Sequence, residues 1–275
     1  MKRVENREIQ RAAADSFSLA GRVAVVTGGG RGIGAGIVET FLEAGATVAV
    51  NALTNIHLAK LVDRLQKIHG ERIVGLPGDA ASADGARDLI ARAVERVGPV
   101  DVLVNGIGDA IFRNLVDEHE TPLVSAGRDE EMRFIVNLNM MSAIHCCSAV
   151  GPTMLRRKHG RIINLTGVLG GLRGFAGMSL YSAAKSGLAG FTRSLAREWA
   201  PRGITVNAIA PGVFPDREHL SREEYDTIER TYLPQIPVGR FGQARELGQL
   251  ARYLASDASS YLTGQVFAFD GGLSA

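Results

Sequence analysis

The sequence predicts an α/β fold in which a doubly wound parallel sheet lies between two layers of helices, a three-layer α/β/α arrangement. Apolar runs rich in β-branched residues recur along the chain, and a segment with helical periodicity follows most of them. Runs that are apolar throughout are typical of strands with both faces buried, as in a parallel sheet. The chain shows no internal repeat and no linker, so we expect a single domain over residues 19–275.

The composition is that of an ordinary globular protein and disfavours several kinds of partner. Hydrophobic residues make up 45% and charged residues 22% of the chain, and the net charge is +2. This balance gives no electrostatic reason to expect nucleic acid or an anionic membrane as a partner. No apolar run approaches the ~20 residues that span a bilayer, and residues 2–11 lack the apolar core of a signal peptide. The two adjacent cysteines, Cys146 and Cys147, suggest neither a disulfide framework nor a metal site, which favours a cytoplasmic location.

The first apolar run, at residues 22–27, is predicted to be a buried strand. It leads directly into a glycine-rich stretch at 27–34, and helical periodicity follows at 35–43. Glycines let the backbone turn sharply and approach a ligand, while the N-terminus of the following helix presents free N–H groups to a phosphate. Strand, loop and helix in this order predict a dinucleotide site built on Gly28, Gly32 and Gly34.

The second strand, predicted at residues 47–51, ends where dinucleotide folds discriminate between cofactors. An acidic side chain there binds the ribose hydroxyls of NAD and repels the 2′-phosphate of NADP. The tip of the strand reads Asn51-Ala-Leu-Thr54, without a carboxylate, and Arg31 in the glycine-rich stretch is suited to pairing with a phosphate. We therefore expect NADP as the cofactor, with NAD as the alternative.

The alternation of strand and helix continues through the first half of the chain. After a helix at 56–69, a third strand at 72–79 ends in Asp79, which either bonds the adenine edge or caps the next helix. A helix at 84–97 leads to a fourth apolar strand at 100–105. Because ligands of such sheets bind at the carboxyl ends of the strands, all of these motifs fall where a cofactor is expected.

The second half of the chain carries the strongest candidates for catalysis, Tyr181 and Lys185 on a helix at 180–199. Residues four apart lie on one face of a helix, so the phenol and the ammonium share one site. A nearby cation favours the phenolate, and we expect it to lower the pKa of Tyr181 towards the range useful for proton exchange with an alcohol or a carbonyl. The other elements expected here are a helix at 130–157, a strand at 160–166, a strand at 205–210, a helix at 244–255 and a strand at 265–269.

These motifs resemble those of the short-chain dehydrogenase/reductase family in its single-domain branch. The matches are separated along residues 18–275 and keep the family's order: the Thr-Gly-x-x-x-Gly-x-Gly loop at 27–34, Gly78-Asp79, Asn105, Asn137, Tyr181 with Lys185, the stretch 207–212, and Asp270-Gly271-Gly272. Any one match is weak evidence, but the ordered set is specific. The resemblance implies a Rossmann-like sheet of about seven strands and, commonly, a homotetramer.

The resemblance also implies an activity and a role for each matched residue. The activity is hydride transfer between a nicotinamide and a carbonyl or secondary alcohol. Tyr181 exchanges the proton, Lys185 binds the nicotinamide ribose and depresses the pKa of Tyr181, and Asn137 holds a water of the proton relay. No metal is expected, and the residues expected to bind the cofactor are Gly28, Arg31, Gly32, Ile33, Gly34, Asp79, Ala80, Asn105, Gly106, Tyr181, Lys185, Pro211, Gly212 and Val213.

The most serious departure from the family pattern is the catalytic serine, which normally follows the fifth strand. Alignment from the strand puts Gly167 in its place, and counting back from Tyr181 gives Val168. Thr166 is the nearest hydroxyl and the candidate substitute; the alternatives are a backbone N–H, Ser179 or a water. Losing one such donor typically costs about 10²–10³ in rate, so the choice matters.

Two smaller departures touch the cofactor. The family's Asn-Asn-Ala-Gly after the fourth strand is replaced by Asn105-Gly-Ile-Gly108. The threonine that often follows Pro211-Gly212 and holds the carboxamide is absent. We expect the first change to alter the adenine side of the cofactor site without abolishing binding.

The overall sequence looks similar to 3-oxoacyl-carrier-protein reductases, so an NADPH-dependent ketoreductase of that type is the expected function. The second reading is an NAD-dependent dehydrogenase of a cyclic diol. The missing serine motivates a third, a catalytically weak NADP-binding sensor or assembly subunit. We expect 213–236 to form a lid over a small carbonyl or alcohol substrate, and 1–18 to be a loosely ordered or short helical extension. Arg113 and Arg173 are candidates for binding an anionic substrate group, although such arginines are more often structural.

Overall fold

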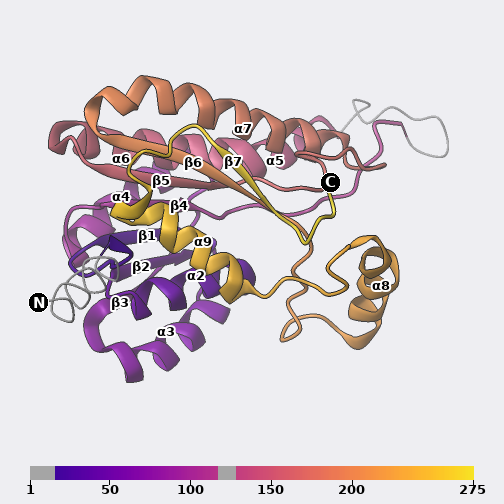
Figure 1. Cartoon of the computed structure of the whole chain (residues 1–275), viewed down its shortest axis with the longest axis horizontal. Coiled ribbons are helices and arrows are strands. Elements are labelled where there is room, and N and C mark those ends of the chain that lie inside the picture. Colours follow the sequence, from indigo (N-terminus) through magenta and orange to yellow (C-terminus); the bar gives the residue numbers. More distant parts are fainter. Residues whose placement is uncertain (1–15, 117–127) are drawn as a thin grey trace, which may run out of the picture.

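The computed structural model describes residues 16–116 and 128–275 and shows a seven-stranded, all-parallel sheet covered by helices on both faces, as predicted (Figure 1). The sheet order is β3-β2-β1-β4-β5-β6-β7. The extension expected at 1–18 lies outside the described residues except for residues 16–18. The strands are β1 (Val23–Thr27), β2 (Thr47–Ala52), β3 (Ile73–Pro77), β4 (Val102–Asn105), β5 (Gly160–Leu165), β6 (Ile204–Pro211) and β7 (Val266–Phe269).

Helices cover the two faces of the sheet with separate apolar cores. On one face, α2 (Gly32–Glu43), α3 (Asn55–His69) and α9 (Ala244–Ala255) pack their apolar sides on the sheet. On the other face, α4 (Ala83–Val97), α6 (Ser142–Arg157) and α7 (Ser179–Trp199) do the same. The described chain also contains α5 (Asp129–Val136) and α8 (Arg222–Tyr232), and Figure 1 shows α8 standing out from the body of the molecule. The three-layer Rossmann-like architecture is confirmed.

A continuous helical stretch from Asp129 to Arg157 joins α5, a π-helical turn at Asn137–Met141, and α6. By length and composition alone this stretch is long and apolar enough to cross a membrane. The core helix of a soluble protein can have the same length and composition, and 44% of the most apolar part of this stretch is buried inside the structure. Cys146 and Cys147 lie buried on α6 as free thiols.

The fold gathers the predicted motifs at one edge of the sheet. β1 lies between β2 and β4, and the strand order runs outwards from this point in opposite directions. At such a switch point the loops after the two strands diverge and leave a crevice outside their carboxyl ends. The glycine-rich loop follows β1, Gly106 follows β4, and the chain that leads to Tyr181 follows β5. Residues far apart in the sequence therefore meet at one candidate site.

Close packing of α2 against α9 depends on glycine. A Cβ built on Gly248 would lie 2.3 Å from Thr40 Oγ1 and 2.8 Å from the backbone oxygen of Gly36. We expect Gly248→Ala to force the helices apart and to lower the free energy of unfolding, measured in urea, by about 2 kcal/mol. Gly190→Ala on α7 is the matched control, because a Cβ there meets nothing within 4 Å. The control should be stabilised by about 0.5–1 kcal/mol, so equal effects of the two variants would contradict this account of the packing.

Candidate active site

The glycine-rich loop between β1 and α2 is closed tightly by backbone packing. A Cβ on Gly28 would lie 2.7 Å from the backbone oxygen of Gly106, and a Cβ on Gly34 would lie 2.3 Å from the oxygen of Gly28. Gly28 also has a φ of +63°, in the left-handed region that favours glycine. Arg31 precedes α2 without a side-chain capping bond, so no cap at this position competes for the N–H groups of the first turn. The loop therefore fits the phosphates of a dinucleotide.

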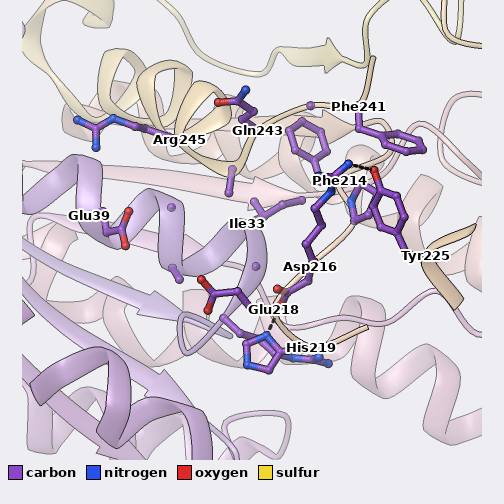
Figure 2. Close-up of a pocket in the computed structure, with 18 of the residues that line it drawn as sticks. Ile33, Glu39, Phe214, Asp216, Glu218, His219, Tyr225, Phe241, Gln243 and Arg245 are labelled. Atoms are coloured by element: carbon purple, nitrogen blue, oxygen red, sulfur yellow. Dashed lines mark hydrogen bonds and ion pairs between the residues drawn. The ribbon is translucent and has the colours of Figure 1, made fainter. Parts of the chain in front are cut away.

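A cavity of about 730 Å³ lies beside this loop, between α2, α3 and the segment after β6 (Figure 2). Its lining includes Arg31, Gly32 and Ile33 from the predicted cofactor set, together with Asp216 and His219 from the facing segment. The volume lies in the range of small-molecule sites. Three of the predicted cofactor residues therefore border a hollow of ligand size.

Two further predicted cofactor residues, Asp79 and Ala80, follow β3. Asp79 accepts a hydrogen bond from the backbone N–H of Ala81 at 2.8 Å and closes a local turn. The N-terminal cap of α4 is Ser82, whose hydroxyl accepts from the N–H of Gly85 at 3.1 Å. Ser82, and not Asp79, therefore caps α4. The other role considered for Asp79, contact with the adenine edge, stays a prediction.

Asn105 and Gly106 at the end of β4 stabilise the frame of the site. The Asn105 side chain is buried and donates to Asn164 Oδ1 on β5 at 2.8 Å. The N–H of Gly106 donates to the hydroxyl of Thr27 at 3.1 Å, which ties the end of β4 to the end of β1. Asn105 thus links neighbouring strands, and a direct contact with the cofactor stays a prediction.

The end of β6 and the turn after it are the third side of the site and contain Pro211, Gly212 and Val213. The N–H of Gly212 donates to the carbonyl oxygen of Phe269 at 3.0 Å, which pins the turn to β7. A Cβ on Gly212 would lie 2.7 Å from the Cα of Asp270, so the close approach requires glycine. The turn is therefore held in place by the Asp270-Gly-Gly stretch that the sequence also singled out.

Tyr181 and Lys185 lie together in the first two turns of α7, as their spacing predicts. Both are buried, with exposed fractions of 8% and 4%. Lys185 Nζ lies 5.8 Å from the centre of the Tyr181 ring and donates to the carbonyl oxygen of Leu165 at 3.0 Å. The last residue of β5 thus holds the ammonium in place beside the phenol.

The pKa of Tyr181 in the structure differs from the lowered value that the sequence led us to expect. Burial and, to a smaller extent, the nearby carboxylate of Asp109 together raise the pKa of Tyr181 to about 12. Burial also lowers the pKa of Lys185 to about 8. The expected lowering of the Tyr181 pKa is wrong, because the desolvation of a buried phenolate outweighs the attraction of an ammonium that is directed at Leu165.

The asparagine beside Lys185 is Asn139, two residues beyond the predicted Asn137. A Cβ on Gly108 would lie 2.7 Å from Lys185 Nζ and 2.8 Å from Asn139 Oδ1, so both groups lie against the same glycine. Asn139 is fully buried; its Oδ1 accepts from the N–H of Asp109 at 3.0 Å and its Nδ2 donates to the carbonyl oxygen of Ile135 at 3.1 Å.

Asn137 is exposed at the start of the π-helical turn. Residues two apart on a helical turn point to roughly opposite sides, so Asn137 does not share the side of Asn139. Helical periodicity could have distinguished the two asparagines. Asn139 is four residues after Ile135 and seven before Cys146, so it lies on the same helix face as these two buried residues.

The hydroxyl expected to replace the catalytic serine is directed elsewhere. Thr166 is 4% exposed, and its Oγ1 donates to the carbonyl oxygen of Ile209 on β6 at 3.1 Å. The next residue, Gly167, instead faces the phenol, because a Cβ built there would lie 2.8 Å from the Tyr181 oxygen. Ser179 is an exposed residue at the first position of α7. The structure therefore places a glycine, and not a hydroxyl, beside Tyr181.

The loops beside Tyr181 carry aromatic rings, and their two arginines are engaged within the chain. Arg113 forms an ion pair with Glu131, and Arg173 donates to the backbone oxygen of Leu273 at 3.2 Å. Phe175 lies 6.1 Å from Phe112 and 5.9 Å from Tyr232, measured between ring centres. Phe175 also packs on the cluster that contains Tyr181. The end of α8 in the predicted lid thus reaches the loops beside the phenol through aromatic contacts.

Comparison with known proteins adds the family. The family model described as enoyl-(acyl carrier protein) reductase matches residues 28–274. A 2,3-dihydroxy-2,3-dihydro-p-cumate dehydrogenase of Pseudomonas putida is 36% identical over 94% of this chain and 96% of its own length. A 3-oxoacyl-(acyl-carrier-protein) reductase of Staphylococcus epidermidis is 35% identical over 91% of this chain and 98% of its own. A solved structure from Sinorhizobium meliloti 1021, provisionally named a short-chain alcohol dehydrogenase, is 38% identical with a TM-score of 0.82, covering 94% of this chain and 98% of that chain. With the glycine-rich loop, Tyr181 and Lys185 gathered at one edge of the sheet, this chain belongs to the short-chain dehydrogenase/reductase family of oxidoreductases.

Proposed function

We propose that this enzyme interconverts a secondary alcohol and a ketone on a small, largely apolar substrate, with NADP as the preferred nicotinamide cofactor. The observation that carries the proposal is the buried pair of Tyr181 and Lys185 at the sheet edge that also holds the glycine-rich loop. A bound nicotinamide supplies or accepts the hydride. Tyr181 gives a proton to the nascent alkoxide during reduction and removes one from the alcohol during oxidation. Lys185 and Asn139 hold the polar groups around the phenol in position.

Two substrate classes follow from the relatives. The 3-oxoacyl-(acyl-carrier-protein) reductases support the expected ketoreductase, and the dihydrodiol dehydrogenase supports oxidation of a cyclic diol. Arg113 and Arg173 are both engaged within the chain, so neither supports binding of a carrier phosphate. The aromatic contacts at Phe112, Phe175 and Tyr232 favour an apolar ring. The geometry thus favours the cyclic diol.

The test is a substrate panel with the pure protein. Cyclic vicinal diols, 3-oxoacyl thioesters and simple ketones and alcohols are assayed with NADPH and NADP and, in parallel, with NADH and NAD. Preferential oxidation of the diols supports the proposal, whereas preferential reduction of the thioesters would restore the 3-oxoacyl reading. Cofactor binding without any turnover would favour the sensor or assembly subunit. The homotetramer and the cytoplasmic location stay predictions.

The preference for NADP is tested at Arg31. This side chain is exposed beside the glycine-rich loop and lines the cavity there. Because a hydrogen bond to a charged group contributes about 1.5–3 kcal/mol, Arg31→Ala should weaken NADP binding about 10- to 100-fold. The affinity for NAD should stay nearly unchanged. Lys67→Ala, at an exposed lysine on α3 outside the cavity lining, is the matched control for loss of one positive charge. If Arg31→Ala lowered the affinity for NADP and for NAD equally, the role of Arg31 in selecting NADP would be rejected.

A further inference from the structure

The N-terminus of α2 is met by a carboxylate from a distant part of the chain. Asp216, in the segment after β6, has its Oδ2 atom 3.6 Å from a Cβ built on Gly32, the first residue of α2. The first turn of α2 has no acidic side chain of its own, and Arg31 forms no side-chain capping bond there. The first N–H groups of a helix have no partner within the helix and attract negative charge. The Asp216 carboxylate is therefore favourably placed at this end of α2.

Two histidines hold Asp216 in this place. His219 Nδ1 donates a hydrogen bond to Asp216 Oδ2 at 2.9 Å. The His219 ring in turn meets the His57 ring of α3 edge to face, with the ring centres 4.2 Å apart. Figure 2 shows Asp216 and His219 at the cavity beside the glycine-rich loop. The segment after β6 is thus docked on α2 and α3 through these side chains.

The docked segment is anchored to the body of the protein at both ends. At its start, Phe214 stacks on Phe269 of β7, with the ring centres 6.2 Å apart. At its end, the N–H of Val238 donates to the carbonyl oxygen of Gly271 at 3.1 Å. Between these anchors, α8 has no buried residue and stands out from the body of the molecule in Figure 1. We call residues 215–235 the flap, and it can move between its anchors without disturbing the sheet.

The docked carboxylate and the phosphates of a dinucleotide need the same place. The glycine-rich loop directs such phosphates to the N-terminus of α2. A phosphate and a carboxylate repel each other, and the helix end favours whichever anion lies against it. Gly32 and Asp216 line the same cavity beside the loop. Docking of the flap and binding of the phosphates therefore oppose each other.

We propose that Asp216 is a built-in competitor of the cofactor phosphates, and that the cofactor displaces the flap from α2 and α3 when it binds. This inference rests on the proposed binding of a nicotinamide dinucleotide at the glycine-rich loop, and it adds a regulation of that site. The contact is autoinhibitory, because the apparent affinity falls with the fraction of molecules whose site is free. The flap contains most of the predicted lid, so release of Asp216 also frees the segment expected to cover the substrate.

The first test measures the dissociation constants of NADP and NAD with the whole protein by isothermal titration calorimetry. Asp216→Asn keeps the size of the side chain and removes its charge. A carboxylate at a helix N-terminus changes an equilibrium constant about two- to fivefold, so Asp216→Asn should bind both cofactors more tightly than the wild type by about this factor. Glu223→Gln, at an exposed carboxylate of α8 outside the cavity lining, is the control for loss of one negative charge and should bind as the wild type does. An unchanged or weaker affinity in Asp216→Asn would overturn the inference.

Variants of the two histidines separate displacement of the flap from a simple effect of charge. His219→Ala removes the bond that holds Asp216, and His57→Ala removes the contact with α3, while neither removes a carboxylate. Both should tighten cofactor binding in the same direction as Asp216→Asn and by up to the same factor. The double variant Asp216→Asn/His219→Ala should bind no more tightly than Asp216→Asn alone, because both changes release one contact.

The other outcomes are equally decisive. Wild-type affinity in both histidine variants, or gains that add in the double variant, would mean that Asp216 acts only through its charge, and displacement of the flap would be rejected. Thermal melting checks that each variant folds. If the wild type binds NADP or NAD and no variant changes the affinity, the inference fails and the proposed function remains. If neither the wild type nor any folded variant binds either cofactor, both are rejected.

Discussion

Replacing Tyr181 by Phe should reduce turnover by about 10²–10⁴, the range for loss of a positioned general acid or base. The substitution removes only the hydroxyl and leaves the ring packed among Ile135, Met178 and Phe175. We therefore expect the variant to fold and to bind the cofactor with near-normal affinity. Steady-state rates in both directions, together with a fluorescence titration of the cofactor, measure the two effects separately.

The pH dependence gives the same residue a second test. In oxidation Tyr181 must be deprotonated to accept the proton, and burial raises its pKa to about 12. The oxidation rate of the wild type should therefore rise with pH throughout the neutral and mildly alkaline range. The reduction rate needs the protonated phenol and should not rise with it. Near-normal turnover of Tyr181→Phe, or its retention of the alkaline rise, would exclude the proton-transfer role. Ser182→Ala, next to Tyr181 on α7, is the control.

The fold could be predicted because its strands are apolar on both faces. β1, β2 and β4 consist almost entirely of buried residues, and each is followed by a loop with a legible polar or glycine signal. The spacing of Tyr181 and Lys185 on one helix was equally readable, since helical geometry alone places them together. These patterns depend only on residues that are close in the sequence, so they can be recognised without knowledge of the fold.

The parts that could not be predicted depend on contacts between distant segments. The sequence shows a hydroxyl at Thr166 but not that the hydroxyl bonds Ile209, which lies on a strand formed more than forty residues later. It shows a lysine near Tyr181, but not that the ammonium of this lysine donates a hydrogen bond to the carbonyl oxygen of Leu165. Nor does it show that burial raises the pKa of Tyr181. The direction of a polar side chain is set by the neighbours that satisfy it, and those neighbours are known only from the fold.

Replacing Asn139 by Ala should damage both catalysis and stability, whereas replacing Asn137 by Ala should affect neither strongly. The Asn139 amide accepts from the N–H of Asp109 and donates to Ile135, so its removal leaves backbone groups near Lys185 without partners. Each unsatisfied buried group costs about 1–3 kcal/mol, and we expect the free energy of unfolding in urea to fall by about 2 kcal/mol. The released Gly108–Asp109 backbone should let Lys185 shift, and kcat should fall about 100-fold, the effect expected when a supporting contact of a preorganised site is lost.

Asn139→Ala and Asn137→Ala form a matched pair of variants. The two asparagines are two residues apart in the sequence, but they lie on different sides of the helix, and only Asn139 is buried. A loss of stability alone would mean that Asn139 only supports the loop. A role in positioning Lys185 predicts in addition that the pH profile of kcat changes in Asn139→Ala, because the ammonium, whose pKa burial lowers to about 8, gains a new environment. Asn139→Asp keeps the acceptor for the N–H of Asp109 and should recover part of the stability. If Asn137→Ala loses activity while Asn139→Ala retains it, the assignment returns to Asn137, and the burial of Asn139 against Gly108 would be structural.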